Sequence, residues 1–107
     1  MKNHLKNHSR EYYKKIILSL IPQTRAEAIP GPELNRLTRL TPRTVRDLIT
    51  ELRVEYPICS KETEGGGYWM AENEQDIIEF VEMIERRRDA HNKTIEVMSH
   101  HIFNERK

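Results

Sequence analysis

The segment from Thr41 to Leu52, TPRTVRDLITEL, is the most informative pattern in this chain. Its apolar residues recur at the i, i+3, i+4 and i+7 spacing that forms one face of an α-helix. They are Val45, Leu48, Ile49 and Leu52. Thr41 is a suitable N-cap, and Pro42 suits the first helical position, where the N–H that proline lacks would have no partner. The pattern predicts a short helix with one buried face.

The opposite face of this predicted helix is polar. At about 100° per residue, the residues on or near that face are Arg43, Arg46, Asp47 and Thr50. A helix of this kind can enter the major groove of DNA, where arginine binds the edges of bases. An ordinary amphipathic helix with a solvated face has the same pattern, so the functional reading depends on the neighbouring segments.

The composition describes a small, helix-rich protein. The 107 residues suit one small domain with an extension. With 18 Lys and Arg against 17 Asp and Glu, the net charge of +1 does not support a general polyanion binder. Any contact with nucleic acid must therefore come from local segregation of charge. Arginine is concentrated in residues 36–53, and acidic residues are concentrated in residues 72–85.

Several features indicate a cytoplasmic protein without a membrane contact. No apolar run approaches the roughly 20 residues that span a bilayer. The polar N-terminal residues 1–15 lack the apolar core of a secretory signal. The single cysteine, Cys59, excludes an intramolecular disulfide, and a position on an inward strand face explains it better than catalysis.

A first helix is predicted to begin at a Ser9 cap and to end near Leu20. Residues 23–30 form a connector, in which residues 28–29 are candidates for a very short strand. A second helix is predicted over residues 32–38.

In the second helix, Leu34 and Leu37 are expected to point inward. The gap of three or four residues before the helix that begins at Thr41 makes these two helices a helix-turn-helix candidate.

A β-hairpin is predicted after these helices. Residues 58–61 and 68–71 are strand-like, and Gly65, Gly66 and Gly67 lie between them. Alternation along the second strand places one of Tyr68 and Trp69 in the core. A hairpin that directly follows a helix-turn-helix is a wing.

The C-terminal third, from residue 73 to about residue 103, is predicted to be helical, either continuous or broken once. It carries a seven-residue seam of the kind that pairs helices. The seam consists of Ile77, Val81, Ile84, Arg88, His91, Ile95, Met98 and Ile102. We expect a homodimer whose interface contains Ile84, His91, Ile95, Met98 and Ile102. The alternative is a turn within residues 89–92, after which the chain folds back on its own domain.

The string LNRLTRLTPRTVRDLITEL, residues 34–52, resembles the winged helix-turn-helix family of prokaryotic DNA-binding regulators. The matching positions are Leu34, Leu40, Thr41, Val45, Ile49 and Leu52. The segments YPICS and GYW are similar to the strands of the wing, and AENEQD is similar to the acidic helix start that follows. The chain is most similar to small winged-helix proteins of bacteriophages and prophages, and more distantly to the biotin-repressor-type DNA-binding domain.

This resemblance implies a mainly α fold of the α+β class. It implies a winged helix-turn-helix domain at residues 10–72, between a flexible N-terminus at residues 1–9 and a C-terminal helical extension at residues 73–107. The implied function is sequence-specific binding of double-stranded DNA through the helix at residues 41–54. The protein would serve as a phage- or prophage-type transcriptional regulator or as a replication-associated protein.

If DNA is the ligand, the helix supplies contacts of two kinds. Arg43 and Arg46 are the candidates for contacts with bases or phosphates. Thr41 supports the start of the helix. Thr44 and Thr50 suit a phosphate or a thymine methyl group. Asp47 suits a hydrogen bond from cytosine or a neighbouring arginine that it would orient. Arg36, Arg39 and Lys61 are candidates for phosphate contacts, which set affinity without reading sequence.

The chain departs from the family pattern at two places in the turn and at the hairpin tip. Asn35 replaces the usual alanine or glycine, and Arg39 replaces the usual turn glycine. A left-handed backbone angle costs energy for any side chain, so we expect a turn of different geometry. The tip carries Glu62 and Glu64 with Lys61 as its cation, which disfavours insertion into the minor groove.

The alternative function is a winged-helix module for protein–protein interaction, an adaptor that binds a phage or host protein without touching DNA. The near-neutral charge, the acidic tip and the acidic last helix favour it. Neither pattern needs a cofactor, and no motif indicates an enzyme. The histidine pairs at residues 4 and 8 and at residues 100 and 101 lack the further ligands of a zinc site, so no metal is expected.

Overall fold

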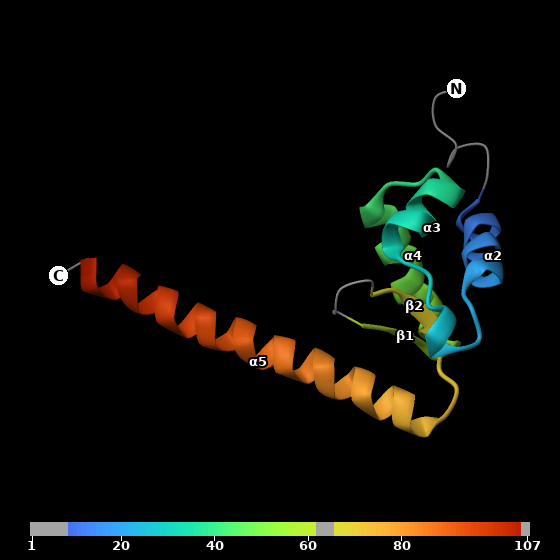
Figure 1. Cartoon of the computed structure of the whole chain (residues 1–107). Coiled ribbons are helices and arrows are strands. Elements are labelled where there is room, and N and C mark those ends of the chain that lie inside the picture. Colours follow the sequence, from blue (N-terminus) through green and yellow to red (C-terminus); the bar gives the residue numbers. More distant parts are fainter. Residues whose placement is uncertain (1–8, 62–65, 106–107) are drawn as a thin grey trace. The chain divides into compact units, whose positions relative to one another are not determined.

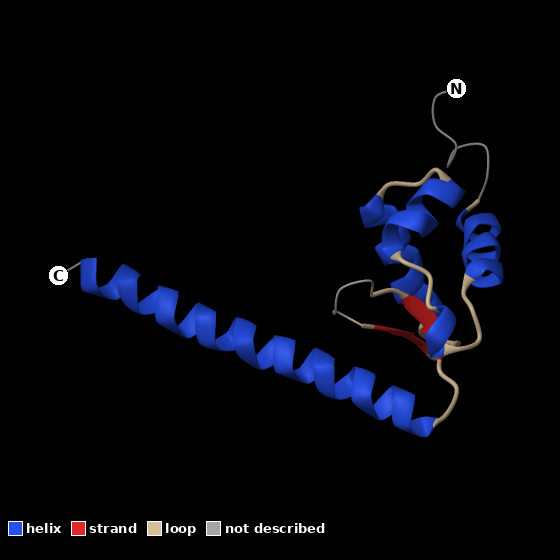
Figure 2. Cartoon of the chain, in the orientation of Figure 1, coloured by secondary structure: helices blue, strands red, loops and turns tan. Residues whose placement is uncertain are grey.

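The computed structural model describes residues 9–61 and 66–105 (Figure 1). Residues 1–8 of the segment expected to be flexible lie outside the described residues. The described chain is mainly helical with a small two-stranded antiparallel sheet, as expected for the α+β class (Figure 2). Its elements are α2 (Arg10–Leu20), η1 (Arg25–Glu27), α3 (Gly31–Thr38), α4 (Pro42–Leu52), β1 (Ile58–Ser60), β2 (Tyr68–Met70) and α5 (Glu74–Glu105).

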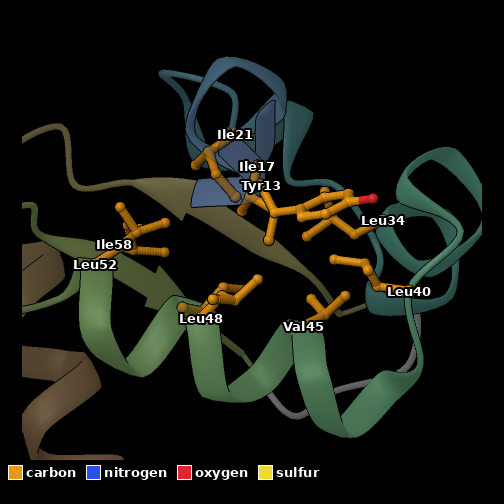
Figure 3. Packing of buried hydrophobic residues seen from close by; sticks show 10 residues of the cluster. Tyr13, Ile17, Ile21, Leu34, Leu40, Val45, Leu48, Leu52 and Ile58 are labelled. Carbon is orange, nitrogen blue, oxygen red and sulfur yellow. The ribbon is translucent and has the colours of Figure 1, made fainter. Parts of the chain in front are cut away.

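The chain divides into two compact units, one up to Ile77 and one from Ile78 onward. The core of the first unit lies between α2, α3, α4 and the hairpin (Figure 3). In Figure 3, Val45, Leu48 and Leu52 project from one side of α4 toward the residues of the other elements. These three residues and Ile49 are at most 5% exposed, which confirms the predicted buried face.

The helices begin where the sequence predicts. The Ser9 hydroxyl accepts a hydrogen bond from the Tyr12 N–H at 3.2 Å, and the Thr41 hydroxyl accepts one from the Thr44 N–H at 3.2 Å. The Thr41 side chain satisfies an N–H of the first turn that has no backbone partner, whereas the Tyr12 N–H is shared between the Ser9 side chain and the Ser9 carbonyl, at 3.1 Å. Both N-caps are therefore confirmed, and Pro42 occupies the first turn of α4 as expected.

The inward face of α3 differs from the prediction. Leu34 is fully buried, but Leu37 is 44% exposed and Thr38 is buried in its place. The Thr38 hydroxyl donates to the Leu34 carbonyl at 2.7 Å and accepts from the Leu40 N–H at 3.3 Å, so its burial leaves no polar group unpaired. The inward position predicted for Leu37 is wrong because Thr38, four residues after Leu34, occupies that side of the helix.

The sheet has a further single pairing beyond the hairpin. In the hairpin, Cys59 lies opposite Trp69, and both are buried, so Trp69 is the buried one of the two aromatic residues, while the partly buried Tyr68 packs against the core cluster. On the other side of β2, the N–H of Ile29 donates to Tyr68 at 2.9 Å and the N–H of Tyr68 donates back at 2.8 Å. The very short strand expected at residues 28–29 is thus a single bridge, which the short helix η1 precedes.

This bridge brings two backbones close together at Gly67. A Cβ atom added at Gly67 would lie 2.4 Å from the carbonyl oxygen of Ile29. Real Cβ atoms do not approach a backbone oxygen so closely, so only glycine fits without a shift of the chain.

We therefore expect Gly67→Ala to lower the free energy of unfolding by about 1–3 kcal/mol, since the bridge must open to admit the methyl group. Urea unfolding would measure the change. Gly31→Ala is the matched control, because its Cβ would lie 3.8 Å from the Tyr68 ring, which is ordinary contact. Equal stability of the two variants would contradict the close approach of the Gly67 backbone to the Ile29 carbonyl.

A buried carboxylate joins the hairpin to the beginning of α5. Asp76 is 8% exposed and accepts from the indole N–H of Trp69 at 3.1 Å and from the N–H of Glu72 at 2.9 Å. The side chain of Asn73 caps the helix by accepting from the Asp76 N–H at 3.0 Å. Arg25 lies 3.8 Å from the carboxylate and 5.2 Å from the centre of the Trp69 ring. The hydrogen bonds from Glu72 and Trp69 hold the pKa of the Asp76 carboxyl below its usual range.

This pKa shift predicts a pH dependence. A carboxyl whose pKa is lower in the folded state stabilises the fold above its unfolded pKa and loses that effect as the pH falls through the folded value. We expect Asp76→Asn to lower the free energy of unfolding by about 1–3 kcal/mol at pH 7, because the charge-assisted hydrogen bonds are lost.

The difference between wild type and Asp76→Asn should then shrink below about pH 4. Urea unfolding at pH 7, 5 and 3 would measure it. Asp47→Asn removes an exposed carboxylate and should change the free energy by less than about 0.5 kcal/mol at pH 7. A difference that persists unchanged at pH 3 would exclude the role assigned to Asp76.

The second unit consists of the continuing α5 helix. This helix runs for 32 residues from Glu74 to Glu105 without a break, so the alternative turn within residues 89–92 is not adopted. Among the described residues, no helix combines the length and apolar character that crossing a membrane requires.

Candidate nucleic-acid interface

The turn between α3 and α4 fixes the position of α4. Arg39 ends α3 with φ 63° and ψ 24°, and its N–H donates to the Asn35 carbonyl at 2.8 Å. The expectation of a different turn geometry is wrong: the left-handed angle is kept with arginine in place of glycine. The conformation costs about 1–2 kcal/mol. The burial of Leu40 and the hydrogen bond of the Thr41 cap stabilise the turn and offset this cost.

The outward face of α4 presents two arginines. Arg43 and Arg46 are exposed because the core holds the opposite side of the helix. Within residues 9–61 and 66–105, no acidic group forms an ion pair with either guanidinium. The N–H of Arg43, in the first turn, also has no acceptor among these residues. Arg43 therefore offers both a side chain and a backbone donor to a ligand.

Asp47 is exposed on the same face. In the described part of the chain, its carboxylate pairs with neither Arg43 nor Arg46. It therefore lowers the positive potential of the face, and the expected role of orienting an arginine is not observed. Acceptance of a hydrogen bond from cytosine is the role that remains open to it.

The two threonines of α4 and its N-cap, Thr41, differ in what they can still donate. The Thr41 hydroxyl donates to the Thr44 hydroxyl at 2.9 Å, which leaves the Thr44 proton for an outside acceptor. The Thr50 hydroxyl donates to the Arg46 carbonyl at 2.9 Å. Thr44 is thus suited to a phosphate, whereas Thr50 offers its methyl group and lone pairs.

The basic segment at residues 36–53 is divided by the fold. Arg36 hydrogen-bonds the Glu33 carboxylate through Nε at 3.2 Å and through Nη2. This bond lowers the pKa of Glu33 and raises that of Arg36. Arg53 turns toward β1, where its Nε donates to the Ile58 carbonyl at 2.8 Å and burial lowers its pKa. Arg53 belongs to the basic segment of the sequence, but in the fold it stabilises the hairpin and does not contribute to the outward face of α4.

An acidic residue of α4 is also removed from the outward face. Glu51 faces α2, where it pairs with Arg10 and, at 3.5 Å, with Lys14. The hydrogen bond from Arg10 lowers the pKa of the Glu51 carboxyl. Within residues 36–53, the cations without a described partner are Arg39 at the turn and Arg43 and Arg46 on the helix, while Lys61 lies half-buried just after β1. The tip residues Glu62 and Glu64 lie outside the described residues.

A shallow depression beside Arg46 was not predictable from the sequence. It is lined by Gly31, Pro32, Asn35, Pro42, Val45, Arg46 and Tyr68. Tyr68 thus joins the candidate interface from β2. The depression combines three segments that are far apart in the chain, so no local pattern indicates it.

Comparisons of the chain with models of protein families, with curated proteins and with solved structures find no match. In the described ranges, no three or more His, Cys, Asp or Glu side chains cluster in a way that could hold a metal ion.

The left-handed angle at Arg39 yields a test of the turn. We expect Arg39→Gly to raise the free energy of unfolding by about 1 kcal/mol, since glycine adopts this angle without the steric cost. Thermal or urea unfolding would measure the gain. Arg39→Ala removes the same charge but keeps a Cβ atom, so it should not gain stability. A glycine variant that is no more stable than the alanine variant would show that the angle is unstrained.

Proposed function

We propose that this protein is a winged helix-turn-helix protein that binds double-stranded DNA sequence-specifically, with α4 as the recognition helix and β1 and β2 as the strands of the wing. The observation that carries the proposal is the outward face of α4. Arg43 and Arg46 have no described ion-pair partner there, on a helix whose rotation is fixed by its buried side.

The dimensions of α4 suit the major groove. A helix with its side chains is about 10–12 Å across, and the major groove is about 12 Å wide and admits an α-helix. Residues near the start of a recognition helix reach base edges. In this proposal Arg43 in the first turn and Arg46 one turn further would bind guanine, and Thr50 would contact a thymine methyl group.

The surrounding groups suit the DNA backbone. Arg39, the Arg43 N–H and the Thr44 hydroxyl are donors near the beginning of α4, and donors of this kind fix the position of a protein on the duplex. Arg36 and Lys61 would supply further phosphate contacts. Arg36 would do so by leaving its ion pair with Glu33 and binding a phosphate instead. The withdrawal of Glu51 to α2 favours DNA over an acidic interaction surface.

The resemblance of residues 34–52 supports a more specific role. We propose a cytoplasmic regulator of transcription, or a replication-associated protein, of the phage or prophage type. It would bind as a homodimer to two half-sites.

Selection from a pool of duplexes with random cores, followed by binding titrations at several salt concentrations, tests the proposal. We expect an enriched motif and a binding constant that falls by about 0.9 log units per phosphate contact for each log unit of salt. No enrichment by a folded protein would reject DNA binding. The adaptor function, with a phage or host protein as partner, would then be the better explanation.

The arginines of α4 provide the decisive variants. We expect Arg43→Ala combined with Arg46→Ala to weaken binding to the selected duplex at least about 30-fold, because each arginine–guanine pair contributes about 1–3 kcal/mol. Fluorescence anisotropy would measure the affinity, and thermal unfolding would verify the fold.

The charge-matched control is Lys15→Ala combined with Arg86→Ala. Both cations are exposed and lie outside α4. The control should lose far less affinity than the α4 variant. Equal losses would mean that net charge, rather than the α4 face, determines binding.

A further inference from the structure

The exposed seam of α5 leaves apolar side chains without cover. Its six apolar residues are between 39% and 62% exposed, on one continuous helix. They are Ile77, Val81, Ile84, Ile95, Met98 and Ile102. We propose that this seam packs against the same seam of a second copy in antiparallel orientation, with Arg88 of each chain against the partner's His91.

The spacing of the seam is symmetrical, which fits an antiparallel copy. The steps alternate between four and three residues and read the same from either end, with the midpoint between Asp89 and Ala90. Two antiparallel helices aligned about this midpoint bring every apolar seam residue opposite another. The pairs are Ile77 with Ile102, Val81 with Met98, and Ile84 with Ile95. Such alternating contacts are those of knobs-into-holes packing.

The two polar residues at the centre select the orientation. In a parallel pair in register, Arg88 would face Arg88, and a guanidinium has only donors to offer. In the antiparallel pair, Arg88 faces the partner's His91, and an imidazole, unlike a guanidinium, can offer an acceptor nitrogen. On its own helix, Arg88 contacts the Asp89 carboxylate at 3.2 Å, which places a compensating negative charge at the same point.

The distribution of charge along α5 favours the same orientation. Residues 74–85 carry Glu74, Asp76, Glu79, Glu82 and Glu85 without a Lys or Arg, and Arg86, Arg87 and Arg88 follow them near the centre of the helix. Residues 94–105 hold Glu96 and Glu105 as their acidic residues. A parallel pair would place the two acidic segments side by side, where like charges repel. The antiparallel pair places each acidic segment beside the less acidic end of its partner.

Molar mass in solution tests the association without DNA, so its outcome is independent of the proposed function. We expect light scattering to give twice the chain mass of 12.8 kDa. Ile95→Asp should give a monomer. Val97→Asp is the matched control, because Val97 is also exposed, at 45%, but lies off the seam. A monomeric wild type, or equal effects of the two variants, would overturn the proposal.

Disulfide cross-linking tests the orientation. Chains with Ile84→Cys and tagged chains with Ile95→Cys would be mixed and oxidised with copper–phenanthroline. The antiparallel pair predicts mixed disulfides, whereas a parallel pair predicts that each variant links to itself. Cys59 is buried, and the wild-type chain serves as the blank. Self-linked Ile84→Cys as the main product would refute the antiparallel orientation.

Discussion

The burial of one side of α4 is the constraint on which the rest of the structure depends. Each side chain that the core removes from water contributes about 1.5–3 kcal/mol, and four of them lie on this helix. Their removal from water fixes the rotation of α4 about its own axis. The same rotation directs Arg43 and Arg46 outward and Glu51 toward α2. The arrangement of charge on the candidate interface is therefore a consequence of apolar packing.

The turn before α4 shows a conflict between local preference and position. Glycine would adopt the left-handed angle at Arg39 at less cost, yet the chain carries an arginine there. Residues that break a local rule without a gain in stability are frequent at functional sites. Here the gain would be functional: Arg39 places a cation at the start of the proposed recognition helix, where a DNA backbone would pass. The Thr41 cap keeps the helix start intact beside it.

The strongly periodic segments could be predicted from the sequence, because their patterns are local. The helices, their caps and the hairpin lie within one or two residues of the expected positions. The misplacement of Leu37 has a physical cause: a helix of eight residues is too short for its pattern to specify which side faces the core. The partners of Arg53 and Glu51, and the contact between Gly67 and Ile29, join segments that only the folded chain brings together. Charge counted along the sequence could not separate these residues from those of the interface.

The proposed pairing of α5 determines the distance between the two copies of the first unit. Asp76 fastens the beginning of α5 to the hairpin of its own unit. In an antiparallel pair, the two Ile77 positions would lie about 38 Å apart, since 25 residues separate the paired Ile77 and Ile102 at about 1.5 Å each. One turn of DNA measures about 34–36 Å. A parallel pair would instead hold the two Ile77 positions side by side. The orientation of the helices therefore sets how far apart the two proposed DNA-binding units can reach, and the antiparallel one matches half-sites on successive turns of the duplex.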